Sequence, residues 1–163
     1  MNAVDFLLQE HRKTEEKFRE IEQADPQQRG ALWRRLQPEL KIHEQMEDNY
    51  LYGPLAQDPR LAGTELGTFQ QRQNEDVRQL EQKMRQLDQL EPAGGDWLAT
   101  FRQIRDALMG HVQEEETRIL PKVPDAWDQA RLDEAGRRMQ EMKQAHTGQA
   151  SRTTEPAQTG RTA

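Results

Sequence analysis

Hydrophobic residues recur at helical spacing in five stretches of this chain, and proline or glycine separates these stretches. Residues three and four positions apart lie on one face of an α-helix, and Val4, Leu7, Phe18 and Ile21 follow this spacing in the first stretch. Alternating β-branched and aromatic residues, which are typical of strands, are missing. The sequence therefore predicts an all-α protein with helices over about residues 2–24, 27–57, 64–90, 96–120 and 125–145.

The ends of the helices carry their own signals. N-caps are expected at three polar residues that precede apolar periodic segments: Asn2, Thr64 and Asp96. Pro38 falls inside the second stretch and allows two interpretations. Either one helix bends at the proline, or a short helix ends near Leu36 and a new one begins with Pro38 in its first turn.

One pattern of six residues occurs in both the second and the fourth stretch. Its first copy is Trp33, Leu36, Leu40, His43, Glu47 and Leu51, and its second, 68 positions later, is Phe101, Ile104, Leu108, His111, Glu115 and Ile119. In each copy the apolar face meets a histidine and, one turn later, a glutamate. His11 interrupts the apolar face of the first stretch in the same way.

These interruptions favour a metal site. A single histidine on an apolar face is most often a satisfied core or surface residue, but two His-Glu pairs are harder to explain in this way. A carboxylate that faces a core is costly unless it is paired or binds a metal. Imidazole and carboxylate together suit iron, zinc or manganese. The neighbouring Glu114 and Glu116 flank the buried face and are expected to be solvated.

Depth along the helices places these residues in one layer. Short connections make consecutive helices antiparallel neighbours. We compared how many residues separate each candidate position from the turn that joins its helix to the next. These separations differ by only a few residues, or a few ångströms at about 1.5 Å per residue, for His11, the His43–Glu47 pair, position 74 and His111. We therefore expect an up-down antiparallel four-helix bundle with the fifth helix packed outside it.

Composition limits the class of protein further. The chain has 163 residues, of which 33% are hydrophobic and 32% charged, so it can fill helix seams but hardly a two-sided sheet. It has no cysteine, which excludes disulfides, thiolate metal sites and cysteine nucleophiles. The net charge of −6 argues against nucleic-acid binding. Without a recognisable secretory signal or membrane span, the protein is expected to be cytoplasmic, with no membrane partner.

The histidines and glutamates described above resemble the ligand pattern of the hemerythrin-like HHE cation-binding domains. The resemblance covers about residues 1–123 and rests on the following residues: His11, His43, Glu47, His111, Glu115 and the Leu120-Pro121 pair after them. It implies a four-helix bundle that holds a non-haem di-iron centre. By the same resemblance, His11, His43 and His111 are terminal ligands, and Glu47 and Glu115 bridge the two irons.

One ligand of that family pattern is missing here. Family members place a histidine on the third helix, where this sequence has Asn74, whereas the apolar periodicity selects Gln73. Glu75 or Asp76 could also fill the position, although both are expected to be surface acids. The resemblance thus leaves the occupancy of the iron near His111 in doubt, because that iron lacks its ligand from the third helix.

Two segments are expected after the four-helix bundle. Residues 124–146 are expected to form an accessory C-terminal helix, and residues 147–163, which are small, polar and without periodicity, a disordered tail.

For function, the sequence favours a non-haem iron protein that binds dioxygen, nitric oxide or peroxide for sensing, storage or stress protection. Two alternatives stay open: a metal-binding or storage protein with one firmly held ion, and a helical interaction module with a degenerate site. No pattern names an organic substrate, so an enzyme is not expected.

Overall fold

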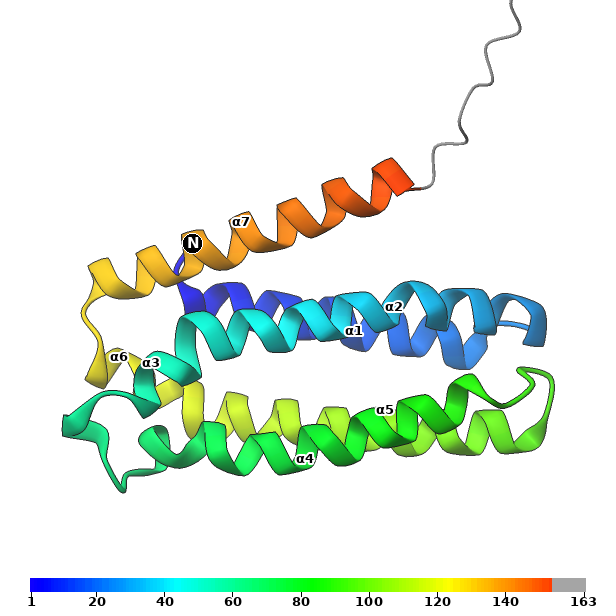
Figure 1. Cartoon of the computed structure of the whole chain (residues 1–163), viewed down its shortest axis with the longest axis horizontal. Coiled ribbons are helices and arrows are strands. Elements are labelled where there is room, and N and C mark those ends of the chain that lie inside the picture. The colour runs from blue at the N-terminus through cyan, green and yellow to red at the C-terminus, as the bar shows by residue number, and fades with distance from the viewer. Residues whose placement is uncertain (154–163) are drawn as a thin grey trace, which may run out of the picture.

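The computed structural model describes residues 1–153, with side chains for residues 1–149, and within these residues all secondary structure is helical. Four long helices form an antiparallel bundle, as the periodicity predicts. They are α1 (Ala3–Gln23), α2 (Pro26–Glu47), α4 (Glu65–Asp88) and α5 (Gly95–Glu114). Figure 1 shows α1 and α2 as one layer, and α4 and α5 as the other. None of the helices in the described part of the chain is long and apolar enough to cross a membrane.

Two of the three expected N-caps are confirmed. The side chain of Asn2 accepts a hydrogen bond from the backbone N–H of Asp5 at 2.9 Å, and that of Thr64 accepts one from Gly67 at 3.2 Å. The prediction for Asp96 is wrong, because α5 begins at Gly95 with Gly94 as its cap residue. Asp96 instead lies in the first turn, where a carboxylate interacts favourably with the helix dipole.

Pro38 lies inside a continuous α2, which supports the first of the two interpretations. A proline removes the N–H that would bond to the carbonyl four residues earlier, here that of Arg34. Both Pro38 and Arg34 are exposed, so this carbonyl can be hydrated instead. The helix therefore passes through the proline without a break.

The second and fourth predicted helices end earlier than expected, and both end in the same way. A π-helical turn, Asp48–Tyr52, follows α2, and another, Glu115–Ile119, follows α5. The short helix α3 (Gly53–Ala56) and a 3₁₀ turn (Pro59–Leu61) complete the first connection, and a 3₁₀ turn (Leu120–Lys122) and α6 (Val123–Ala126) follow the second. The sequence repeat is thus also a repeat of backbone structure.

The C-terminal helix α7 (Gln129–Thr153) lies outside the bundle against α1 and α2 (Figure 1). Its Gly136 approaches the backbone of the N-terminus so closely that an added Cβ would lie 2.4 Å from the carbonyl oxygen of Met1. The carboxylate of Glu10, which is buried in α1, pairs with Lys143 of α7. These contacts fix α7 on the helix that also carries His11.

α7 is longer than predicted. Residues 147–153 are helical and not part of a disordered tail, because nothing at residue 146 ends the helix and the Thr147 hydroxyl donates to the Lys143 carbonyl at 3.0 Å. The remaining residues of the expected tail, 154–163, lie outside the described residues.

The hydrophobic core has two parts. One lies towards the end with α3 and α6 and includes Phe6, Met46, Leu51 and Phe69. The other lies towards the opposite end and includes Phe18, Trp33, Leu36, Trp97 and Phe101. The aromatic residues Trp33, Trp97 and Phe101 are buried there as core anchors. Between the two parts lies a layer that contains buried polar side chains.

Candidate metal centre

The polar layer brings the five predicted site residues together. His11 comes from α1, His43 and Glu47 from α2, His111 from α5, and Glu115 from the π-helical turn that follows α5. They form two groups whose potential ligand atoms lie within 4.8 Å of one another: His11, His43 and Glu47, and Glu47, His111 and Glu115. Because Glu47 belongs to both groups, the two potential cation positions are adjacent.

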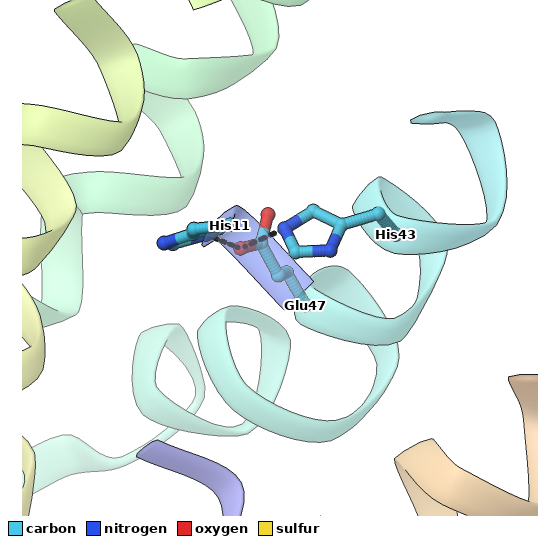
Figure 2. A group of neighbouring side chains, drawn as sticks. All are labelled: His11, His43 and Glu47. Carbon is cyan, nitrogen blue, oxygen red and sulfur yellow. Dashed lines mark ion pairs between the residues drawn. The ribbon is translucent and has the colours of Figure 1, made fainter. Parts of the chain in front are cut away.

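Glu47 lies between imidazoles from two helices (Figure 2). Its Oε1 atom is 3.0 Å from Nε2 of His43 and 3.7 Å from Nε2 of His11. Glu115 occupies a matching position on the other side. Its Oε2 atom is 3.3 Å from Nε2 of His11, and its Oε1 atom is 3.2 Å from Nε2 of His111. Both carboxylates are almost completely buried, and they face the same space.

Several atoms in this space form no hydrogen bond of regular geometry with the described residues, although groups of opposite charge lie 3.0–3.7 Å from them. They include Nε2 of His11, Oε1 of Glu47 and Oε2 of Glu115. Buried polar atoms in folded proteins are nearly always hydrogen-bonded. Here three imidazole and carboxylate atoms, of the types that bind transition metals, lie together in one buried layer without regular hydrogen bonds, which fits a bound cation. This is the structural reason to interpret the layer as a metal centre.

When no cation is bound, protons on the imidazoles would balance the buried carboxylates. Burial alone would lower the pKa of His11, but the carboxylates of Glu115 and Glu47, 3.3 Å and 3.7 Å from its Nε2 atom, raise it to about 10. Burial would also lower the pKa of His111, but the Glu115 carboxylate outweighs burial and raises this pKa to about 9. Burial would raise the pKa of Glu47, yet His43 and His11 hold it well below its usual range. Metal binding must therefore displace protons from imidazoles.

Glu116 supports His11 from outside the site. Its Oε1 atom is 3.0 Å from Nδ1 of His11, a contact that turns the other ring nitrogen, Nε2, towards Glu47 and Glu115. Such a carboxylate–histidine contact fixes the orientation of a metal-ligating imidazole. The expectation that Glu116 is simply solvated is therefore wrong, because its carboxylate contacts His11 of α1.

Tyr52 was not among the predicted site residues, although it lies in this layer. Its hydroxyl donates a hydrogen bond of 2.8 Å to Oε1 of Glu115, and both residues are buried. Phe69 packs edge-on against the Tyr52 ring and stacks on His111. Tyr52 is the fifth residue after Glu47, and it reaches the same face because this segment is π-helical. The α-helical periodicity of 3.6 residues does not place it there.

Gln73 occupies the position of the missing ligand. It is buried, and its Nε2 atom is 3.2 Å from Nε2 of His111 and 3.5 Å from Oε2 of Glu47. Asn74, Glu75 and Asp76 are all exposed. Of the four residues that the sequence left open, the structure therefore brings only Gln73 into the centre, as the apolar periodicity favours.

A four-helix bundle with imidazoles and carboxylates projecting into its core defines a helical-bundle metalloprotein. Comparison with known proteins identifies the family. The family model of the hemerythrin HHE cation binding domain matches residues 2–123. The chain belongs to the hemerythrin HHE cation-binding domain family.

Two individual proteins are similar to this chain. A crystal structure of a hemerythrin HHE cation binding domain-containing protein from Mycobacterium kansasii superimposes with a TM-score of 0.75 at 26% identity, over 96% of each chain. A protein from Nostoc sp. described as a DNA nickase is 23% identical over 124 residues, which is 76% of this chain. The match covers 34% of the Nostoc protein, so the chain spans about a third of that relative's length.

We expect the stability of the metal-free protein to fall as pH rises from about 6.5 to about 9. A histidine whose pKa is raised above its unfolded value of about 6.5 stabilises the fold below pH 6.5, and this contribution is lost as pH rises through the folded value. For His111 and His11 the folded values are about 9 and about 10. At about 1.4 kcal/mol per pKa unit, a loss of a few kcal/mol is expected.

Thermal unfolding of metal-free protein across this pH range measures the effect. His11→Gln removes one of the two raised groups and should flatten the profile, whereas His146→Gln should leave it unchanged. A metal-free wild-type protein with constant Tm from pH 6.5 to 9 would contradict the assignment of these protons.

The position of Gln73 leads to a second expectation. Gln73→His should strengthen binding of the cation near His111, because it adds an imidazole beside Glu47 and His111. Asn74→His, on the exposed face one residue later, should change metal affinity by less than twofold. Titration of both variants with zinc, followed by calorimetry, measures stoichiometry and affinity for each position. The reverse result, with Asn74→His the stronger binder, would show that α4 presents a different face to the centre.

Proposed function

We propose that the protein binds two non-haem iron ions on either side of Glu47 and that this centre takes dioxygen, nitric oxide or peroxide as its exogenous ligand. The observation that carries the proposal is the pair of adjacent His/Glu groups that share Glu47. Membership of a cation-binding family supports the metal, and imidazole with carboxylate suits iron. Iron bound there would supply Lewis acidity and electrons for binding small oxygen or nitrogen ligands.

The residues of the chain have distinct roles in this proposal. His11 and His43 would hold one ion with Glu47, and His111 and Glu115 would hold the other with the same Glu47. Tyr52 keeps a proton at its hydroxyl beside Glu115, because burial raises the pKa of this phenol well above its ordinary value. The rings of Tyr52 and Phe69 keep bulk water from the side of the centre near α3.

Gln73 makes the two positions unequal. The position near His111 has one imidazole, whereas the other has two. The carbonyl oxygen of Gln73 is buried without a partner among the described residues. The amide oxygen and nitrogen are nearly indistinguishable in shape, and the opposite amide orientation would place the oxygen 3.2 Å from Nε2 of His111. In that orientation Gln73 supplies a neutral oxygen ligand, which is weaker than a histidine.

This asymmetry favours one alternative function, a storage or binding protein that holds a single ion firmly. The interaction module with a degenerate site has less support, because such a site would not be expected to retain three imidazole and carboxylate atoms without regular hydrogen bonds in a buried layer. Iron content and optical response to dioxygen or nitric oxide separate the three functions.

Glu47→Gln tests the proposal most simply. The shared carboxylate belongs to both positions, so its loss should weaken both ions by more than the roughly 10–100-fold typical of outer-shell changes. The matched control is Glu114→Gln, which alters a half-buried carboxylate that pairs with Arg72 and Arg118 at 3.1 Å and 3.6 Å outside the centre.

The measurement is iron content after anaerobic purification, followed by the absorption spectrum on exposure to dioxygen. Wild type and Glu114→Gln should contain more than one iron per chain and develop a near-ultraviolet band, and Glu47→Gln should do neither. One iron without an optical response in wild type would favour the storage function, and no iron would favour the interaction module.

A further inference from the structure

A cavity of about 430 Å³ lies beside the metal centre, between α2 and α4. One end is formed by ligand residues, including His43, Glu47 and His111. From there it runs along apolar side chains of three helices: Leu40 of α2, Val77, Leu80 and Met84 of α4, and Leu108 of α5. The cavity therefore gives the centre an apolar neighbour that the sequence does not indicate.

The cavity follows from how the helices pair. α1 packs along α2, and α4 along α5, whereas α2 and α4 approach each other closely at only a few positions. The leucines and the methionine that line the cavity pack at the edge of the core part that contains Trp33 and Phe101, on its side between α2 and α4. Leu40, Val77, Leu80 and Leu108 consequently remain half-buried although they lie on the apolar faces of their helices.

The size of the cavity indicates an organic ligand. Pockets that bind small organic molecules measure roughly 300–1,000 Å³, and the cavity is within this range. A water molecule, which is similar in size to a diatomic ligand, takes up only about 30 Å³. A diatomic ligand or peroxide would thus leave most of the cavity empty or filled with water against apolar walls.

Hydrogen bonds between α2 and α4 define the two ends. Near the centre, Gln73 of α4 reaches Glu47 of α2 at 3.5 Å. Towards the other end, Gln37 of α2 donates to Asp88 of α4 at 2.6 Å. In this antiparallel register Arg34 and Arg85 lie at the same end, remote from the centre. From His43 to Arg34 the helix rises by about 14 Å, at about 1.5 Å for each residue.

The charges along the cavity have opposite signs at its two ends. Arg34 and Arg85 line its remote end, and neither has an ion pair among the described residues. Asp88 lies near these cations, but its carboxylate already accepts hydrogen bonds from Trp33 and Gln37. Between the ends, Lys41 of α2 and Glu81 of α4 contribute opposite charges, and nearer the centre the rim carries Glu44 and Asp76. An anionic group is therefore attracted to the remote end and repelled from the rim near the centre.

We propose that the cavity binds a linear aliphatic monocarboxylate, with the carboxylate between Arg34 and Arg85 and the chain lying along Leu40, Leu80 and Leu108 towards the metal centre. An extended chain advances about 1.2 Å per bond, so about twelve bonds span the distance between the ends. Binding goes beyond the proposed function and needs no metal. Only the position of the methyl end relative to bound metal rests on the proposed function.

Calorimetric titration of the metal-free full-length protein with dodecanoate tests the binding. Dodecanoate should bind with a stoichiometry of one, and dodecylammonium, with the same chain and the opposite charge, should bind at least tenfold more weakly. Arg34→Glu with Arg85→Glu replaces both cationic partners of the carboxylate by acids, so it should weaken dodecanoate binding by at least about tenfold.

The matched control is Arg35→Glu with Lys83→Glu, which makes the same charge change at neighbouring positions outside the cavity lining. This control should alter affinity by less than twofold. Leu80→Trp, which fills the cavity, should abolish saturable binding, and circular dichroism reports whether that variant is folded. The exposed charge reversals do not depend on the core, so they test the proposal even if Leu80→Trp fails to fold.

Nuclear magnetic resonance of dodecanoate with manganese-loaded protein tests the orientation, with zinc-loaded protein as the diamagnetic reference. The terminal methyl protons should relax faster than those next to the carboxylate. Equal binding of dodecylammonium, or unchanged dodecanoate affinity in the Arg34/Arg85 variant, would overturn the proposal. Dodecanoate binding by a protein that takes up no metal would instead contradict only the proposed function.

Discussion

The structure depends on placing the Glu47 carboxylate in the middle of the bundle, where it is 2% exposed. A buried carboxylate is stable only with positive charge or hydrogen-bond donors around it. Here they come from separate helices, since His43 lies one turn away on α2 and His11 approaches from α1. The same layer is completed by Glu115, which faces His11 and His111. The negative charges of Glu47 and Glu115 can be balanced by protons or by a cation. In either case α1, α2 and α5 must place their histidines at the same level along the bundle.

This constraint explains the form of the rest of the bundle. The hydrophobic core is divided because a layer of polar side chains separates its two parts. Each helix that carries a His-Glu pair changes to a π-helical turn at or immediately after the glutamate, and such turns are often found at functional sites. Glu116 and Tyr52 then reach the centre from these turns, one to orient His11 and the other to donate to Glu115. The apolar cavity lies where α2 and α4 do not pack closely.

Sequence periodicity was sufficient to predict the four-helix bundle and the convergence of His11, His43, Glu47, His111 and Glu115, because apolar spacing fixes the face of each helix and short connections fix its depth. It also favoured Gln73 over Asn74, since a helical face is fixed by spacing. It could not find Tyr52, because a change from 3.6 residues per turn to a π-helical turn over five residues leaves no mark in the pattern of apolar positions. The contact of Glu116 and the cavity were missed because both depend on how the helices are spaced.

Crystals of protein loaded anaerobically with ferrous iron, with anomalous diffraction recorded at the iron edge, would test the shared centre most directly. Two peaks are expected inside the bundle, about 3.5–4 Å apart as in other two-metal sites. One should lie beside His11 and His43 and the other beside His111 and Glu115, with Glu47 between them. Iron found only on the surface, with the imidazoles of His11 and His43 still paired directly to Glu47, would contradict the assignment of this layer as a metal centre.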